Sequence, residues 1–409
     1  MLLSVPADAT PTGPAAPPPD LALVLSGGGA RGAYQAGVLR GIGRLLPELR
    51  VPILVGVSAG GINTVVIAAH PAPLGESSRA LAKVWRRLET ADVFRVDTPS
   101  LAKYFTRWVT RLSTGGSAVS PSVRGLVDAS PLQQLVESTV ATVDGEFVGI
   151  GRNLERGLLH AVALTTLNYS TGQTITWVQG ADIRPWSRPR HRSFNSRLTI
   201  GHVMASAALP LFFPAVRLGD SWHGDGGVRL DAPLSGAVHL GASRILAISP
   251  RYEQSEEEAS RHKISGYPPP AQILSHLMNS IFLDVLDRDA RTLEIFNRLI
   301  RPLPVERRHG MRPVDILVLR PSEDLGLLAA KYEPRLAPAF RYLTRSLGTR
   351  ESTTPDFLSM LMFQPDYLGR LLEIGERDAL AHGDEIRRLV AAGAAPSEGA
   401  NSGDGDLGA

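Results

Sequence analysis

The sequence predicts an α/β fold with a mainly parallel central sheet and a helical C-terminal part. Two short apolar runs, at residues 21–25 and 51–57, are each followed by a turn of small residues and then by a helical pattern. Right-handed crossovers place such consecutive strands parallel in one sheet, so both turns should lie at its carboxyl edge. Later strand patterns at 244–249 and 314–319 flank a helical stretch from about 271 to 300. We therefore expect a single intertwined domain.

Composition excludes several classes of protein. The 409 residues are 43% hydrophobic, enough for a full core, and the net charge is only +3 with a pI of about 9.3, so nucleic acid is not expected as a partner. The absence of cysteine excludes disulfides, thiolate catalysis and cysteine-bound zinc. No apolar run is long enough for a membrane span, and the first residues lack a secretory signal pattern. We expect a cytoplasmic location.

Both ends and one internal segment differ in character from the rest of the chain. Residues 1–19 are rich in proline and alanine and residues 395–409 are polar, so we expect both to be disordered. Residues 79–125 have the character of an insertion, with a basic amphipathic helix at 100–112. Such a helix either packs on the core or acts as a lid that meets a lipid surface, and the sequence leaves both open. Ser130, followed by proline, is then expected to cap a helix from 131 to about 140.

One serine lies at the sharpest turn of the predicted sheet. Residues 51–61 pass from an apolar run through Gly56-Val57-Ser58-Ala59-Gly60 into a helical segment. A G-x-S-x-G turn needs small residues two positions on either side of the serine, because the strand and the helix nearly touch there. The hydroxyl is then pushed beyond the strand at the positive end of a helix, which suits a nucleophile. Taken alone, the pentapeptide could also be an ordinary turn of small residues.

A glycine-rich loop at residues 26–32 follows the first strand and is expected beside Ser58. Its Gly27-x-Gly29-x-x-Gly32 spacing also matches a dinucleotide fingerprint, but the next strand ends without the acid that would bind a ribose. We favour an oxyanion hole, in which the loop amides converge and the Ala59 amide joins them from the serine turn. Arg31 would either orient a phosphate or support the loop.

A glycine-rich segment at residues 223–227 contains a second side chain that could react, Asp225. Asp225 lies within His223-Gly-Asp-Gly-Gly227, where glycines on both sides allow a loop to approach the serine closely. The elements expected before it are a strand pair at 158–167 and 173–178, a polar connection at 184–197, a short helix at 200–208 and an apolar wall at 211–213.

A serine hydroxyl becomes nucleophilic when a base takes its proton, so Ser58 needs a partner. Of the ten histidines, His223 is the best placed, whereas His202 lies within an expected helix and His70 points away from the turn. Asp225 is the stronger candidate if the apolar wall removes it from water and raises its pKa. The alternative is that Asp225 only caps a glycine-rich turn.

Four motifs, in order over residues 20 to about 250, together resemble the patatin-like phospholipase family: the loop at 27–32, the serine turn at 56–60, Ala205-Ser-Ala-Ala-Leu-Pro-Leu-Phe-Phe-Pro214 and Asp225-Gly226-Gly227. The resemblance implies a three-layer α/β/α fold and hydrolysis of lipid acyl esters by a Ser-Asp dyad without histidine. Ser58 would be the nucleophile and Asp225 the base. The oxyanion hole would involve Gly27, Gly28, Gly29, Arg31 and Ala59, and the remaining motif residues would be Gly32, Gly56, Gly60, Gly226 and Gly227.

These expectations describe a serine lipid acyl hydrolase of phospholipase A or lysophospholipase type, working through an acyl-enzyme without a metal or organic cofactor. A catalytic domain would span 20–250, and a mostly helical region at 251–394 would pack on it. The partners would be a lipid or acyl ester substrate and a membrane surface met peripherally. Acyl transfer by the same dyad and a catalytically silent membrane-binding protein are the alternatives. Head group, acyl position and oligomeric state stay open.

Overall fold

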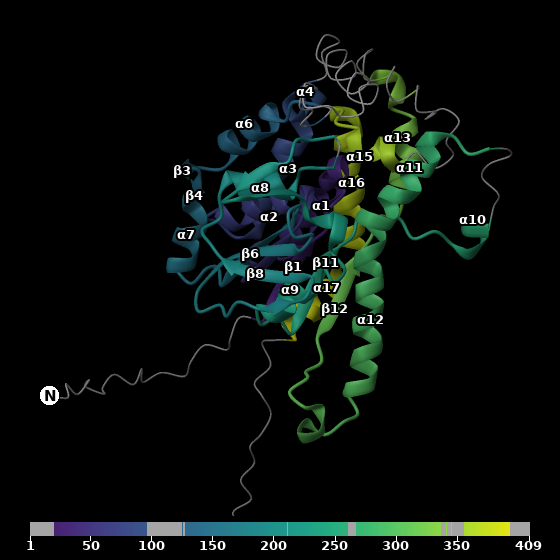
Figure 1. The fold of residues 1–409 in the computed structure, drawn as a ribbon. Coiled ribbons are helices and arrows are strands. Elements are labelled where there is room, and N and C mark those ends of the chain that lie inside the picture. Colours follow the sequence, from purple (N-terminus) through teal and green to yellow (C-terminus); the bar gives the residue numbers. More distant parts are fainter. Residues whose placement is uncertain are drawn as a thin grey trace, which may run out of the picture.

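The computed structural model describes residues 20–95, 125, 127–210, 212–260, 267–336, 341, 345 and 356–392 (Figure 1). Ten of the strands in this part of the chain form one sheet with the path β12-β11-β1-β2-β5-β6-β8-β7, and β10 and β9 branch from β5. The strands from β12 to β5 along this path are parallel. The bounds are β1 (Leu21–Leu25), β2 (Ile53–Gly56), β5 (Ala161–Asn168), β6 (Thr174–Gly180), β7 (Ser187–Arg188), β8 (His191–Asn195), β9 (Val216–Leu218), β10 (Ser221–Asp225), β11 (Arg244–Ile248) and β12 (Asp315–Leu319).

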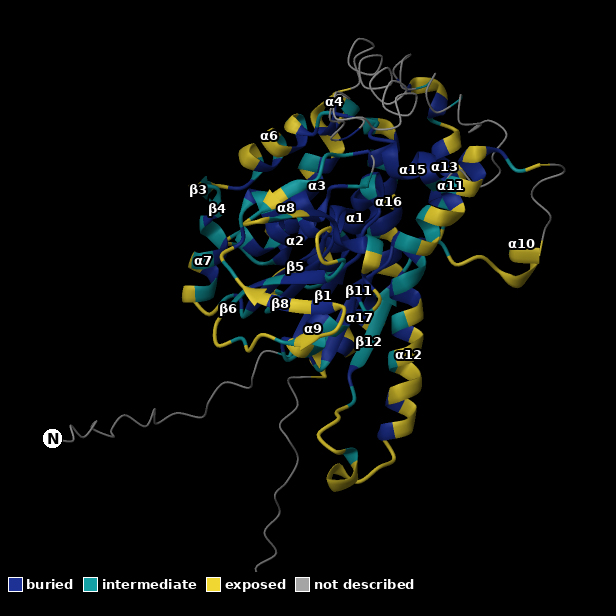
Figure 2. Ribbon diagram, viewed as in Figure 1, coloured by how far each residue is buried: buried dark blue, intermediate teal, exposed yellow. Residues whose placement is uncertain are grey.

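Helices cover both faces of this sheet, and its central strands β11, β1, β2 and β5 are buried between them (Figure 2). Alternate residues such as Leu23 and Leu54 pack against α1 (Gly32–Leu45), α2 (Ala59–Ala69), α3 (Leu74–Arg87) and α16 (Pro365–Ala381). Their neighbours Val24 and Val55 pack against α9 (Ser235–His239) and α12 (Asp284–Ile300). Side chains of a strand alternate between its faces, so apolar residues at successive positions require a layer on each side. The predicted three-layer fold with a mainly parallel sheet is confirmed.

The other described elements are short or lie in the C-terminal half. They are η1 (Gly29–Arg31), α4 (Thr90–Val93), α6 (Ser130–Thr139), β3 (Thr142–Val143), β4 (Glu146–Phe147), α7 (Val148–Glu155), α8 (Ile200–Ser206), η2 (Gly226–Arg229), α10 (Glu256–Ser260), α11 (Pro270–Met278), η3 (Asn279–Leu283), η4 (Val305–Arg308), α13 (Leu325–Ala330), η5 (Glu333–Arg335), α15 (Asp356–Leu361) and α17 (Gly383–Ala391). The segment η3 is a π-helical turn between α11 and α12. The predicted helical C-terminal part is therefore present, and β12 within it pairs with β11 of the central sheet.

Helix α16 lies directly against α1, although more than 300 residues separate them. The two backbones approach so closely that a Cβ on Gly375 would overlap the Tyr34 carbonyl, and one on Gly41 would lie 2.6 Å from the Ala379 Cβ. At the edge of this contact Glu376 forms ion pairs with Arg40 and Arg44. The C-terminal helices are thus packed against the first helix of the sheet. The division at residue 250 stays a prediction.

Two local predictions need correction. Residues 184–197 are not merely a polar connection, because they contain β7 and β8, and β8 pairs with β6 in parallel. Ser130 is the first residue of α6 rather than its cap, and its hydroxyl bonds the Asp128 carboxylate instead of the helix backbone. Both segments are polar in sequence because they lie at the surface. Surface polarity does not distinguish an edge strand from a loop.

The expected insertion at 79–125 falls largely outside the described residues. Its first part, residues 79–87, belongs to α3, where Leu81 and Trp85 are buried in the core beside α1 and α2. The amphipathic helix predicted at 100–112 lies outside the described residues. The same is true of the arm at 1–19 and the tail from 395.

Candidate active site

Ser58 occupies a strained corner between β2 and α2. Its backbone has φ 57° and ψ −131°, which a residue with a Cβ adopts only under constraint from its surroundings. The neighbouring glycines make the corner feasible, since a Cβ on Gly56 would lie 2.6 Å from the Gly60 carbonyl oxygen and one on Gly60 would overlap the Leu25 carbonyl. The corner therefore brings three main-chain segments into contact below the serine. The predicted strand, sharp turn and helix are all found here.

Asp225 reaches the same place from the strand that continues along β5 beyond the end of β2. It ends β10, which pairs antiparallel with the last residues of β5, and its side chain is completely buried. Oδ1 accepts the Gly227 N–H at 2.8 Å, whereas Oδ2 has no hydrogen-bond partner among the described residues. Burial raises the pKa of Asp225 to about 7, although the nearby Ser58 hydroxyl and the Gly227 amide act to lower it. A carboxyl with this pKa is ionised often enough near neutral pH to accept a proton.

The glycine loop lies beside the serine, as predicted. A Cβ on Gly27 would lie 3.1 Å from the Ser58 Cβ and 3.7 Å from its Oγ, so only a glycine backbone fits this close to the hydroxyl. Gly29 has φ 57° and packs under the Met360 carbonyl, which a Cβ would overlap. Ala59 is the first residue of α2, where the first N–H groups lack helical partners. The loop and the helix start thus present main-chain amides near one side chain.

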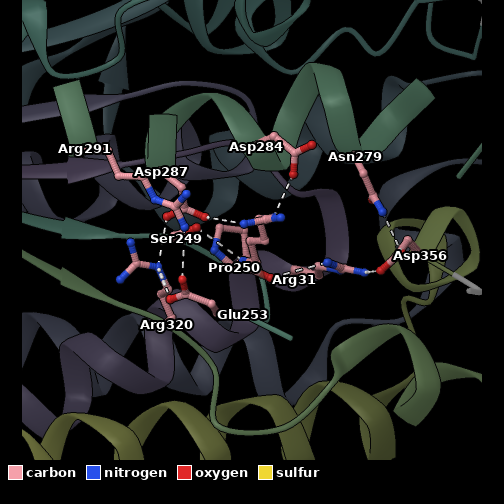
Figure 3. Close-up of polar contacts among 11 residues, drawn as sticks. Arg31, Ser249, Pro250, Glu253, Asn279, Asp284, Asp287, Arg291, Arg320 and Asp356 are labelled. Atoms are coloured by element: carbon pink, nitrogen blue, oxygen red, sulfur yellow. Dashed lines mark hydrogen bonds and ion pairs between the residues drawn. The ribbon is translucent and has the colours of Figure 1, made fainter. Parts of the chain in front are cut away.

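Arg31 points away from Ser58. Its Nε donates to the Ser359 hydroxyl at 2.6 Å. Its Nη1 donates to the Pro250 carbonyl at 3.3 Å, and its Nη2 pairs with Asp356 (Figure 3). Its main-chain N–H is bonded to the Gly28 carbonyl at 3.1 Å. Of the two roles left open by the sequence, these contacts favour support of the loop, and they argue against Arg31 as an oxyanion donor.

The nearby histidines are held by other groups. His223 Nδ1 bonds the Thr166 hydroxyl at 3.0 Å, and its Nε2 lies 3.5 Å from the Asn168 amide. His202 bonds the Thr199 hydroxyl at 2.9 Å, and burial lowers its pKa to about 4. His70 ends α2, where its Nδ1 accepts the Ala72 N–H at 3.1 Å. None of these bonds reaches Ser58.

An apolar pocket opens from Ser58 between α2, α3 and α6. Ala59, Ile62 and Val66 line it from one face of α2, so it follows that helix for about 10 Å at 1.5 Å per residue. Among the described residues the lining holds no charged side chain, and it is completed by Gly29, Val65, Leu81, Val84, Trp85, Leu88, Val93, Leu132, Leu135, Val136, Thr139, Val140, Val203, Ala207, Phe213 and Phe363. A pocket lined in this way suits a hydrocarbon chain.

Metal and membrane-span features are not found in the described part of the chain. No group of three or more histidine, aspartate or glutamate side chains there could hold a metal ion. None of the described helices combines the length and apolar character needed to cross a bilayer.

Comparison with protein families gives one match. The model of the family described as patatin-like phospholipase matches residues 23–238, just over half of the chain. The chain belongs to the patatin-like phospholipase family. The match runs from β1 to the end of α9 and so includes Ser58, the glycine loop and Asp225.

Structures similar to this patatin-like protein have low sequence identity to it. They include VipD from Legionella pneumophila, with 12% identity over 90% of this chain and a TM-score of 0.36. Human GIVD cytosolic phospholipase A2 is 13% identical over 92% of this chain, with a TM-score of 0.44. The type III effector protein ExoU, from Pseudomonas aeruginosa, is 14% identical over 90% of this chain, with a TM-score of 0.34. The chain covers 67%, 60% and 54% of these three proteins, respectively. No curated protein matches it in sequence.

Part of the site in this patatin-like protein comes from beyond the family match. Phe282 of η3 packs over both halves of the site, since a Cβ on Gly27 would lie 3.5 Å from its ring and one on Gly227 would lie 2.7 Å away. Met360 of α15 belongs to the same small cluster. Sequence analysis missed Phe282, because an apolar residue within a long helical pattern carries no sign of an active site.

The apolar wall expected at 211–213 has a different place. Phe212 and Phe213 pack edge-to-face against Phe94, with ring centroids 5.3 and 5.9 Å apart, and Phe213 also lines the pocket. Residue 211 lies outside the described residues. The side chain that packs against Gly227, beside Asp225, is Phe282. The expectation that 211–213 desolvates Asp225 stays a prediction, and Phe282 adds a contact from the C-terminal half.

Proposed function

We propose that this protein is a serine lipid acyl hydrolase of phospholipase A or lysophospholipase type that uses Ser58 and Asp225 as a dyad. The observation that carries the proposal is the buried Asp225 carboxyl. Its Oδ2 has no hydrogen-bond partner among the described residues, its pKa is about 7, and the Ser58 hydroxyl is a neighbour. The histidines nearby are bonded to other groups. The apolar pocket beginning at Ser58 and the family membership support a lipid acyl chain as the substrate.

The proposed reaction has two halves. Asp225 accepts the proton of the Ser58 hydroxyl as Oγ attacks the ester carbonyl carbon, and amides of Gly27 to Gly29 and of Ala59 stabilise the oxyanion. Collapse of the tetrahedral intermediate expels the alcohol, which takes the proton from Asp225 and leaves the acyl group on Ser58. Asp225 then deprotonates a water molecule that attacks the acyl-enzyme. The fatty acid leaves and Ser58 Oγ recovers a proton.

Product analysis with labelled lipids tests this proposal. The parent protein should release fatty acid from a panel of phospholipids, lysophospholipids and neutral glycerides, and a fluorophosphonate probe should label Ser58. Ser58→Ala should abolish both, while Ser138→Ala, at an exposed serine of α6, should change neither. Fatty acid release that survives in Ser58→Ala would reject the dyad.

Acyl transfer is the second candidate, because an alcohol bound in place of water would intercept the same acyl-enzyme. Adding a lysophospholipid or glycerol acceptor to the assay separates the two: a transferase makes the acylated acceptor at the expense of free fatty acid. A silent membrane-binding protein would show vesicle binding with no product in either assay.

We also propose that the protein meets its lipid at a membrane surface through α11. This helix leads into η3 and Phe282, and it exposes Ile273 and Leu277, one turn apart on the same face. Ile273→Gln with Leu277→Gln should weaken binding to phospholipid vesicles and slow hydrolysis of vesicle lipid, while hydrolysis of a short monomeric ester is preserved. Equal loss on both substrates would contradict a surface role.

A further inference from the structure

The last turn of α8 touches both members of the proposed dyad. The Ser58 main-chain N–H donates to the Ser206 hydroxyl at 3.0 Å, and that hydroxyl donates to the Thr165 carbonyl at 2.7 Å. Two residues further on, the Ala208 carbonyl accepts the main-chain N–H of Asp225 at 3.0 Å. One short segment, residues 206–208, therefore holds the main chain of the nucleophile at one end and the main chain of the base at the other.

The Ser206 hydroxyl is suited to this position because it both accepts and donates. Ser206 is fully buried, and its two bonds use one lone pair and the single O–H proton. Loss of the hydroxyl would leave the Ser58 N–H and the Thr165 carbonyl each without this partner. A buried donor without a partner carries its full desolvation cost, so the local backbone would rearrange.

The strained backbone of Ser58 makes this bond important. A non-glycine residue at φ 57° stays there only when its surroundings over-determine the conformation. On one side Ser58 is fixed by the bonds from Gly61 and Ile62 to its carbonyl. On the other side its N–H is fixed by Ser206. The Ser206 hydroxyl thus makes the side-chain hydrogen bond that holds the main chain on the N-terminal side of the Ser58 turn.

The same hydroxyl is coupled to Asp225 through the sheet. Thr165 precedes Thr166, which is paired with Asp225 in the β5–β10 ladder, and Gly226 packs on the Thr165 carbonyl so closely that a Cβ would overlap it. A shift of Thr165 would therefore move the strand against which Asp225 is placed. Small displacements of reacting groups have large effects on rate.

We propose that Ser206 is a positioning residue, which sets the distance and direction between Ser58 Oγ and the Asp225 carboxyl. The proposal rests on the proposed function, because it assigns Ser206 a role in the same dyad. Ser206 touches the main chain of Ser58, not the substrate, so its effect should be on the rate of acylation rather than on substrate binding.

The test compares Ser206→Ala with Ser78→Ala, a matched change at a fully buried serine whose hydroxyl bonds the Leu74 carbonyl within α3. The readouts are kcat and KM for a short monomeric ester, the rate of labelling by a fluorophosphonate, and thermal melting. Ser206→Ala should lower kcat and labelling by about 10- to 100-fold with KM within about twofold. Ser78→Ala should keep kcat even if it melts at a lower temperature.

Two further variants test the role of the hydroxyl in case Ser206→Ala does not fold. Ser206→Thr keeps the hydroxyl and should recover most of kcat, whereas Ser206→Cys keeps the size but offers only a weak acceptor and should lose activity. If Ser206→Cys and Ser206→Ala match Ser78→Ala in kcat, the positioning role is rejected.

Hydrogen exchange of the Ser58 amide separates this proposal from the proposed function. Faster exchange at that amide in Ser206→Ala is expected whether or not the protein hydrolyses lipid. An inactive parent with faster exchange in the variant would reject the hydrolase and keep the positioning role. Unchanged exchange at Ser58 would reject the positioning role.

Discussion

Arg31 and Asp356 lie 325 residues apart in the chain and form an ion pair in which Arg31 is almost completely buried. Arg31 lies within the glycine loop, while Asp356 begins α15 and also accepts a hydrogen bond from Asn279 of η3 at 2.7 Å. The pair therefore connects the loop beside Ser58 to the helices that carry Phe282 and Met360. In this way the C-terminal half takes part in the structure of the site.

Removal of Asp356 should destabilise the protein strongly. Asp356→Ala leaves the buried Arg31 guanidinium without its carboxylate, and breaking a buried pair in this way costs about 3–5 kcal/mol. The matched control is Asp366→Ala, which breaks an exposed pair with Arg335 and should cost about 0–1 kcal/mol. Urea unfolding of both variants measures the difference. Equal midpoints would show that the Arg31 pair adds no more than a surface pair.

Ser58 and Asp225 should behave as a unit. Ser58→Ala and Asp225→Asn should each remove nearly all ester hydrolysis, and the double variant should be no worse than the weaker single variant, because either change stops the same step. His223→Ala is the control, since His223 is bonded to Thr166 and Asn168. Steady-state kinetics of the four variants is the measurement. A loss in His223→Ala as large as that in Asp225→Asn would argue for a triad.

The activity should rise with pH near neutrality. Asp225 acts as a base only when ionised, and its pKa is raised to about 7 mainly by burial, so kcat/KM should increase through about pH 7 and then level off. Burial lowers the pKa of both His202 and His223, which moves their titration away from the rising limb. The profile of His223→Ala should therefore follow that of the parent. A profile that is flat from pH 5 to pH 9 would contradict Asp225 as the base.

Ionisation of the Asp225 carboxyl should lower the stability of the folded protein as pH rises. Its folded pKa of about 7 lies above the ordinary value of 3.8, so the folded state holds a proton that the unfolded state has lost between these values. The contribution of Asp225 to stability should be greatest below about pH 4, should decline as pH rises, and should level off above about pH 7. Asp225→Asn removes this ionisation and should be more stable than the parent at pH 8 by roughly 4 kcal/mol, with the difference vanishing near pH 4. Urea unfolding at several pH values gives both curves, and parallel curves would contradict the prediction.

The glycine loop should tolerate no side chain at residue 28. A Cβ there would lie 3.0 Å from the Pro250 ring and 3.4 Å from the Arg31 Cβ, so Gly28→Ala should displace the main chain of the loop beside Ser58. Loss of one oxyanion donor lowers kcat by about 10²- to 10³-fold, with a smaller effect on substrate affinity. Gly151→Ala in α7 is the control, because a Cβ there meets no atom within 4 Å. Unchanged turnover with weakened NAD(P) binding would instead favour the dinucleotide reading of the loop.

Much of the fold could be predicted because it depends on local patterns. Apolar runs followed by small-residue turns predicted β1, β2 and the helices after them, and parallel pairing followed from the crossover rule. The edge strand β7 and its neighbour β8 were missed because their exposed residues are as polar as those of a loop. The insertion was predicted to begin at residue 79, which lies inside α3. The charged residues on the exposed face of this helix made its sequence resemble a surface insertion, although Leu81 and Trp85 are buried.

The sequence by itself determined which side chains could react. A serine between glycines, an aspartate between glycines and a loop of consecutive glycines are local signals, because each reflects a backbone that only small residues permit. Only the tertiary structure decided what surrounds them. Ser206, Phe282 and Asp356 reach Ser58, Gly27 and Arg31 across 148 to 325 residues of chain, and contacts over such separations depend on how helices pack on the sheet. The burial that raises the pKa of Asp225 is likewise a property of the folded chain rather than of the residues next to Asp225 in the sequence.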